Sequence, residues 1–214
     1  MRALAELIMR GRAQACGVAL FGWLLPLVSP ATIGLVSLRK DSTEGLIVTL
    51  WALLPWLALY MASDVSLLVL LLPLTVLVVI AAVANVLRST ASWQWTFVVT
   101  GVVSALAAIA TGFIASADVD LMVAKVAEYL AQFNDQAEMS EEFNFAPDRT
   151  FVLGLFAWII GSTVACGLLV SRWWQALLFN PGGFQEEFHG FRLDQSVAVI
   201  LVAIVIAGVS LPLS

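Results

Sequence analysis

Residues able to carry catalytic or metal chemistry are few in this chain, and they do not cluster. The single histidine, His189, follows Glu186 and Glu187, but a metal site needs further ligands and the surrounding sequence offers none. Asp118 and Asp120 form a closely spaced carboxylate pair, yet no base stands beside them. The sequence therefore predicts no metal site and gives no acid–base pair.

Within the apolar stretches, polar side chains are rarer still. A buried ionisable group in a bilayer is costly and usually functional, and only Asp64 and Asn85 come close to such a position. We expect Asp64, which stands in a tight turn, to cap the helix that follows it. Ser104 and Ser162 lack a histidine that would activate them, and no phosphate-binding or dinucleotide motif occurs. The sequence therefore predicts a protein that is not an enzyme and holds no cofactor.

The overall composition places the chain in a lipid bilayer. Its 214 residues are 61% hydrophobic and 12% charged, whereas soluble domains are about 45–50% apolar and about 25% charged. The net charge of −5 is a local property, because eight of the fifteen acidic residues stand between positions 118 and 149. The sequence has no run of basic residues of the kind that binds nucleic acid, so we expect no nucleic-acid partner. Cys16 and Cys166 fall in apolar runs, which argues against a disulfide.

A membrane-spanning helix needs about 20 apolar residues. Five stretches are predicted to span the membrane: Leu46–Ala62, Val65–Leu87, Trp95–Ser116, Phe151–Ser171 and Ser196–Leu213. A further apolar stretch, Ala13–Leu38, is either one long kinked span or a hairpin of two short segments. The sequence thus predicts an all-α, polytopic transmembrane helix bundle of about six to seven membrane segments, which forms a single domain over residues 1–214.

The basic residues indicate how Ala13–Leu38 is threaded, because Lys and Arg gather on the cytoplasmic side of a membrane. A single crossing would place five of them on each side. A hairpin that turns near Pro26 and Pro30 places eight on one side and two on the other. The hairpin is therefore favoured, with the N-terminus in the cytoplasm. Its difficulty is length, since each arm is shorter than a full span.

Residues 117–150 form an insertion rich in acidic side chains, which the same charge rule places on the outer side of the membrane. Apolar residues recur in it at helical spacing and predict one or two amphipathic helices: Val119, Met122, Val126, Tyr129, Leu130 and Phe133. Helices on a membrane surface usually have a basic polar face, whereas this one is acidic. We therefore expect the insertion to cap the bundle or to bind a cationic partner.

Residues 172–194 form the most distinctive local sequence. The run from Asn180 to Gly183 predicts a turn, and aromatic residues flank it on both sides. We expect this segment to be an elbow in the cytoplasmic headgroup layer, where amphipathic rings are favoured. Trp158 stands instead near the middle of a predicted span, so its indole N–H is expected to find a partner within the bundle.

Small residues recur at four-residue spacing in the first apolar stretch. Such a ridge lets helices approach closely; most ridges serve internal packing, and an exposed one is a docking face for another membrane protein. The candidate docking residues are this ridge together with side chains of the elbow: Gly11, Ala15, Ala19, Trp173, Trp174, Phe184, Phe188 and Arg192.

Four local stretches resemble the YybS-like family of bacterial membrane proteins: Ala5–Arg12, the Leu38–Leu46 loop, Trp51–Pro55 and the Trp173–Arg192 elbow. The likeness covers most of the chain and involves no catalytic motif. The family is grouped with the substrate-binding S components of energy-coupling-factor transporters. In those proteins a helix bundle holds a vitamin-like ligand toward the outer face, and a ridge of alanines on the first helix docks onto a coupling subunit. Ala15 and Ala19 fit that ridge.

The resemblance implies a non-enzymatic subunit for small-molecule binding or transport in the bacterial inner membrane, with residues 117–150 in the periplasm. Its pocket would open to the outer face near Trp23, Trp56, Tyr60 and Asp64. The alternative is a membrane scaffold or assembly partner, which docks another membrane protein without transporting anything. The first hypothesis requires a pocket, and the second requires an exposed docking face.

Overall fold

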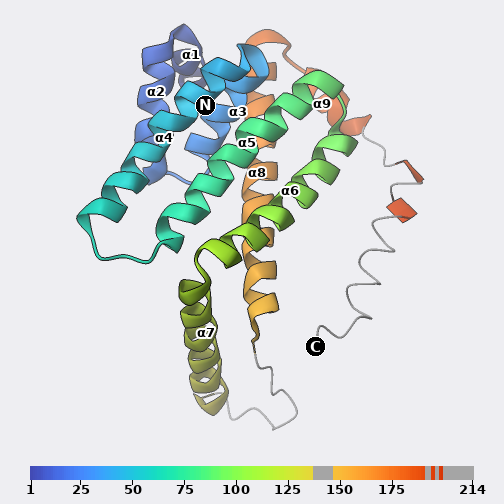
Figure 1. The fold of residues 1–214 in the computed structure, drawn as a ribbon. Helices are drawn as coiled ribbons and strands as arrows, with labels where there is room; N and C mark the ends of the chain where they lie inside the picture. Colours follow the sequence, from blue (N-terminus) through green and yellow to red (C-terminus); the bar gives the residue numbers. More distant parts are fainter. Residues whose placement is uncertain (137–146, 191–193, 196–197, 200–214) are drawn as a thin grey trace.

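The computed structural model describes residues 1–136, 147–190, 194–195 and 198–199, and these ranges contain helices and no strand (Figure 1). In chain order the helices are α1 (Arg2–Arg10), α2 (Arg12–Phe21), the 3-10 helix η1 (Gly22–Leu24), α3 (Val28–Arg39), α4 (Ser42–Ala62), α5 (Leu68–Thr90), α6 (Trp93–Ile114), α7 (Ser116–Gln136), α8 (Arg149–Phe179) and α9 (Gly183–His189). The predicted all-α class is confirmed for this part of the chain.

Four of the helices, α4, α5, α6 and α8, are long and apolar enough to cross a membrane. They correspond to four of the five full-length spans predicted from the sequence, while the fifth, Ser196–Leu213, lies outside the described residues except at two positions. α8 continues to Phe179, about two turns beyond the predicted end at Ser171. The four helices together indicate an integral membrane protein.

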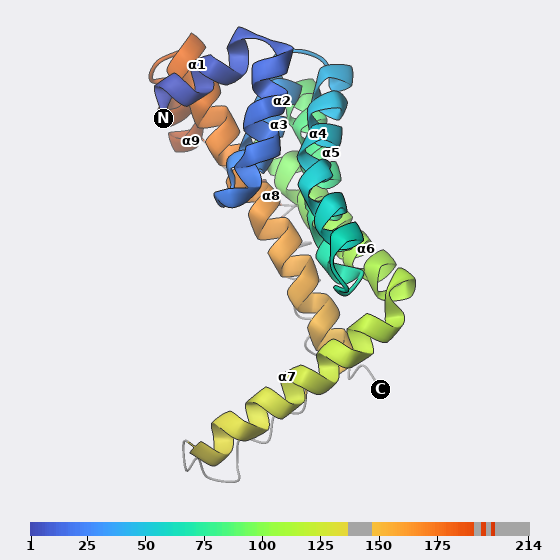
Figure 2. The ribbon, with the colours of Figure 1, turned by 90° about the vertical axis from the view of Figure 1, so that its left-hand side faces the viewer.

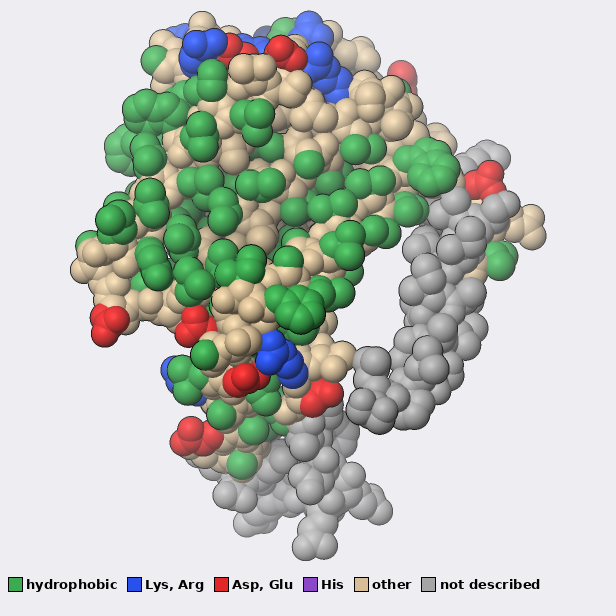
Figure 3. Space-filling model, viewed as in Figure 1, with side chains coloured by type: hydrophobic (Ala, Val, Ile, Leu, Met, Phe, Trp, Pro, Cys, Tyr) green, Lys and Arg blue, Asp and Glu red, His purple; other side chains and the backbone are tan. Residues whose placement is uncertain are grey.

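The outer surface of these helices is largely apolar, as a surface in contact with lipid must be (Figure 3). Trp158 belongs to this surface, because its side chain is 69% exposed. Phe156 and Ile160, two positions away on either side, are buried, so the helical period turns Trp158 away from the bundle. The expectation that its indole finds a partner inside the bundle is therefore wrong.

The stretch Ala13–Leu38 is divided into two helices, α2 and α3, which lie side by side (Figure 2). The Ser29 hydroxyl of α3 donates a hydrogen bond to the Ala19 carbonyl of α2 at 2.8 Å. The helices have 10 and 12 residues, which makes them about 15 and 18 Å long against about 30 Å for the hydrocarbon core. The stretch is thus a hairpin whose arms are about half a bilayer long, and the count of six to seven membrane segments is not confirmed.

α3 lies at the centre of the bundle, and residues 29–38 are all buried. Small side chains let the neighbouring helices approach it closely. A methyl group on Gly34 would collide with Ser171 of α8, and one on Gly45 of α4 would collide with Ser37 of α3. These contacts fix α4 and α8 against the hairpin.

Charged residues separate toward the two ends of the bundle (Figure 3). We call one end the basic end. Six of its Lys and Arg residues stand in the first or last turn of a helix or next to one, and Arg172 lies two turns before the end of α8: Arg2, Arg10, Arg12, Arg39, Lys40, Arg88 and Arg172. The opposite, acidic end carries residues 63–67, α7 and the start of α8. Such a distribution matches the hairpin threading, since a single crossing of Ala13–Leu38 would divide the basic residues evenly.

α7 forms a predicted helix of the acidic insertion and extends away from the bundle at the acidic end (Figure 2). Its first turns are anchored. Val119 is fully buried, Asp118 accepts a hydrogen bond from the Leu67 N–H at 3.1 Å, and Asp120 pairs with Arg149 of α8 at 3.0 Å. The described part of the insertion is therefore fixed to the bundle at its base and does not cover the bundle as a cap.

The start of α5 is capped differently from the sequence-based expectation. The amide of Leu67 donates to Asp118, and the amide of Leu68 donates to the Ser66 hydroxyl at 3.2 Å. Asp64 is exposed and stands four residues before the first helical residue, whereas a capping side chain must stand directly at the helix start. The prediction that Asp64 caps this helix is wrong.

Candidate functional site

An apolar cavity of about 250 Å³ lies at the tip of the α2–α3 hairpin, and we call it the tip pocket. It is bounded by η1 and the hairpin turn on one side and by α4, α5 and α8 on the other. The lining residues are Gly22, Trp23, Leu25, Pro26, Leu27, Ser29, Pro30, Trp56, Leu72, Pro73, Val76, Leu77, Ile159, Ile160 and Thr163.

The backbone at this tip leaves the α-helical conformation for several residues. η1 occupies Gly22–Leu24, Leu25 is extended, and Leu27 has a left-handed φ of 68°. Inside a bilayer such backbone is tolerated where it is buried in protein or lines a cavity, because no water is present to bond its polar groups. Here it lines the tip pocket.

Two of the residues that line the tip pocket are tryptophans. The rings of Trp23 and Trp56 meet edge to face, with centroids 5.9 Å apart and an interplanar angle of 72°. Both were expected to contribute to a ligand pocket, and the structure brings them together. Tyr60 and Asp64, expected beside them, are not lining residues of this pocket. Tyr60 stands one helical turn beyond Trp56, toward the acidic end, and Asp64 is exposed past the end of α4.

The polar character of the tip pocket comes from backbone and hydroxyl groups. α3 begins here, and a helix N-terminus carries a partial positive charge. Ser29 and Thr163 add hydroxyls, while the lining includes no acidic, basic or histidine side chain. Across the described residues, no group of His, Cys, Asp and Glu could hold a metal ion. The arrangement suits binding of a molecule with an apolar body and a hydrogen-bond acceptor.

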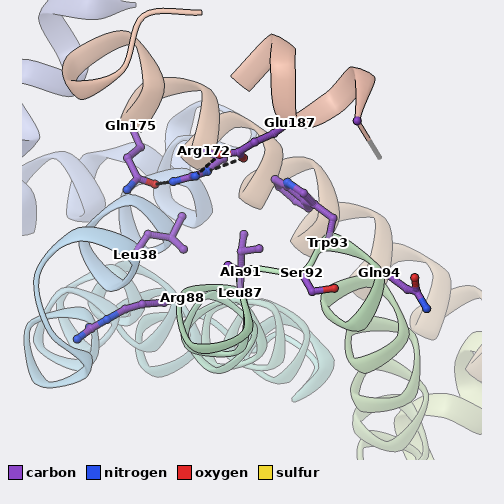
Figure 4. A pocket seen from close by; sticks show the side chains of 11 residues that line it. Leu38, Leu87, Arg88, Ala91, Ser92, Trp93, Gln94, Arg172, Gln175 and Glu187 are labelled. Carbon is purple, nitrogen blue, oxygen red and sulfur yellow. Dashed lines mark hydrogen bonds and ion pairs between the residues drawn. The ribbon is translucent and has the colours of Figure 1, made fainter. Parts of the chain in front are cut away.

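A second, more polar cavity of about 510 Å³ lies at the basic end, where α9 faces the ends of α5 and α8 (Figure 4). We call it the elbow pocket. Its lining residues are Leu38, Leu87, Arg88, Ala91, Ser92, Trp93, Gln94, Arg172, Gln175, Glu187 and Gly190. The sequence did not indicate this pocket.

An ion pair between Arg172 of α8 and Glu187 of α9 lies in the wall of this pocket. The Arg172 guanidinium donates from Nε to Glu187 at 3.0 Å and from Nη1 to Gln175 at 2.6 Å (Figure 4). The Arg172 hydrogen bonds lower the pKa of the Glu187 carboxyl, with a smaller contribution from Trp93. The turn that brings α9 back toward α8 contains Gly182, whose φ of 94° favours glycine. The predicted elbow thus consists of the end of α8, a turn and the short helix α9, and the ion pair between Arg172 and Glu187 joins the two helices.

The candidate docking residues are not collected on one exposed face. Ala15 and Ala19 are buried within the bundle, and Trp174 is only 2% exposed, so these three residues cannot contact another protein. The ridge serves internal packing because α2 lies directly against α3 and α4. Gly11 and Phe184 are half-buried and Trp173 is 38% exposed. The side chain of Phe188 and the whole of Arg192 lie outside the described residues.

Comparison with known proteins adds no relative: no protein-family model, curated protein or solved structure matches this chain.

Proposed function

We propose that this protein is a non-enzymatic membrane subunit that binds a small amphipathic molecule in the tip pocket. The resemblance to YybS-like proteins, which are grouped with the S components of energy-coupling-factor transporters, is consistent with such a role. The observation that supports the proposal is the non-helical backbone between Gly22 and Leu27, which lines a cavity together with Trp23 and Trp56. Transporters use interrupted helices of this sort to bind substrates near the bilayer midplane.

The lining of the tip pocket indicates the class of ligand. Its volume of about 250 Å³ lies just below the range of about 300–1,000 Å³ that ligand pockets usually span, so the ligand would be small. The walls are mostly aliphatic, and Trp23 and Trp56 offer ring surfaces for an apolar or planar body. The N-terminus of α3 offers its partial positive charge to an acceptor group. A small, largely apolar molecule with one polar end fits these walls.

The same proposal gives the protein an orientation. The basic end would lie in the cytoplasm and α7 in the periplasm of a bacterial inner membrane, which agrees with the bias of Lys and Arg toward the cytoplasmic side. Because each hairpin arm is about 15–18 Å long, the tip pocket would lie near mid-membrane. This position is deeper than the site near the outer face that the sequence suggested.

Substitution of Trp56 by leucine tests the proposal, with Trp51→Leu as the matched control. Both tryptophans stand on α4, but Trp51 is exposed to lipid and does not line the tip pocket. Native mass spectrometry of protein purified in mild detergent should show a bound small molecule in the wild type and in Trp51→Leu. Trp56→Leu should lower its occupancy by about tenfold, which corresponds to a contact of roughly 1.4 kcal/mol.

Equal occupancy in the two variants would contradict a ligand site at the hairpin tip. Absence of a bound small molecule from all three proteins would do the same. Recovery of a second membrane protein with the pocket empty would favour the scaffold alternative.

A further inference from the structure

A hollow bordered by cationic side chains lies at the basic end, between α1 and the last residues of α3 and α8. It has a volume of about 660 Å³ and shares no lining residue with the tip pocket or the elbow pocket. We call it the basic hollow. Arg2 and Arg10 of α1, Arg39 of α3 and the following Lys40 line it, with Glu6 as its one acidic side chain.

The charges around the basic hollow are not balanced. Glu6 pairs with Arg2 at 2.9 Å within one turn of α1. Within the described part of the chain, Arg10 and Lys40 form no ion pair. An anion in the hollow would therefore meet several positive charges and only one acidic side chain, which is already paired.

One of these cations is held in place by an aromatic ring. The Arg39 guanidinium lies over the Phe179 ring, with its central carbon 4.1 Å from the ring centroid. A cation–π contact uses the flat face of the guanidinium and leaves the N–H groups at its edge available as donors. Those donors match phosphate oxygens in pairs. Arg39 also stands in the last turn of α3, where the helix dipole favours a cation.

The other wall of the basic hollow is apolar. Leu178 and Phe179, at the end of α8, form this wall. Ala5 and Ile8 are buried, so α1 lies against the bundle end, where the membrane-capable helices terminate and where lipid headgroups are expected. We propose that the basic hollow binds the phosphate headgroup of an anionic phospholipid, with the glycerol and acyl carbons against Leu178 and Phe179. A free anion would make no use of this apolar wall.

Lipid titration of the purified full-length protein tests the proposal. Native mass spectrometry would count bound phosphatidylglycerol and, separately, zwitterionic phosphatidylcholine in the wild type, Arg39→Gln, Lys40→Gln and Lys125→Gln. The last variant is the control, because it removes the same charge from an exposed position on α7 at the acidic end. We expect each substitution in the hollow to weaken phosphatidylglycerol binding about fivefold and Lys125→Gln to leave it unchanged.

The result would overturn the proposal if Lys125→Gln weakened binding as much as Lys40→Gln, or if phosphatidylcholine bound as tightly as phosphatidylglycerol. Competition with inorganic phosphate separates the two sources of the phosphate group. Retention of phosphatidylglycerol in excess phosphate supports a lipid site. Its displacement would assign the hollow to a free anion and overturn the lipid assignment. Thermal unfolding of each variant would verify that the fold is kept.

Discussion

The hydroxyl of Ser171 stands 2.9 Å from the Ala31 carbonyl and 2.6 Å from the Gly167 carbonyl, where α8 packs against α3. Gly34 faces the same side chain. Ser29 makes a similar bond to the Ala19 carbonyl between α3 and α2. In a bilayer, where burial of apolar surface does not drive helices together, close packing of small residues and hydrogen bonds between helices hold a bundle.

Replacement of Gly34 by alanine tests the importance of this packing. The added methyl would collide with Ser171, so we expect a loss of about 1–3 kcal/mol in unfolding free energy, the usual cost of overpacking. Gly101→Ala on α6 is the control, because its methyl would meet no atom within 4 Å and should be neutral or stabilise by up to about 1 kcal/mol. Denaturant unfolding in detergent would measure both. Equal destabilisation by the two substitutions would contradict the tight contact.

Single residues also show what the sequence could and could not predict. The four-residue spacing of Ala15 and Ala19 indicated close helix approach, and both residues are buried in such contacts. The spacing did not say whether the neighbouring helix belongs to this chain or to a partner. Trp23 and Trp56 meet because the hairpin tip lies beside α4, a contact that depends on the depth of the hairpin and has no local signal.

At the scale of elements, α9 is fastened to α8 by the pair between Arg172 and Glu187. The two side chains are 30% and 36% exposed, so solvent screens them and the pair is worth up to about 1 kcal/mol. Because the pKa of Glu187 is lowered in the fold, its contribution is fully present above the ordinary glutamate pKa. It is lost as the pH falls through the lowered pKa.

Acidification should therefore loosen the attachment of α9 to α8. Hydrogen exchange of the α9 amides, compared with that of α5, should rise in the wild type as the pH falls through the lowered pKa of Glu187. The Glu187→Gln variant should show α9 exchange that is already faster at neutral pH, by up to about fivefold for a pair worth about 1 kcal/mol, and no further acid-dependent step. Glu186→Gln is the control, since Glu186 is exposed, and it should behave like the wild type. The same profile in both variants would show that the pair does not hold α9.

The hairpin shows how far sequence patterns predict an element. The prolines and the placement of Lys and Arg predicted that Ala13–Leu38 turns back, and α2 and α3 do so. Its depth was not predictable, because it depends on α3 packing in the centre of the bundle. The capping of α5 by Asp118 was likewise hidden, since the two groups stand 51 residues apart in sequence.

At the scale of the whole molecule, the two ends differ in charge, and this difference gives the fold a testable direction in the membrane. The hairpin occupies the half of the bundle next to the basic end, so α1, the hairpin ends and the elbow lie together there (Figure 1). The basic hollow and the elbow pocket also open at that end. Apart from the four membrane-capable helices, α7 is the one described helix at the acidic end.

Cysteine labelling would test both the direction and the threading. With Cys16 and Cys166 replaced by alanine, single cysteines would stand at Arg2, Thr43 and Lys125, which are all exposed. We expect a membrane-impermeant maleimide added to intact cells, with the outer membrane opened, to label Lys125→Cys. The variants Arg2→Cys and Thr43→Cys should react only after the inner membrane is permeabilised. Labelling of the first two positions from opposite sides would mean that Ala13–Leu38 crosses once. Labelling of Arg2→Cys and Thr43→Cys from outside, with Lys125→Cys protected, would agree with the hairpin but would mean that the protein has the opposite orientation in the membrane. Position 125 is separated from position 43 by the three crossings of α4, α5 and α6 in either threading, so these two positions should always be labelled from opposite sides.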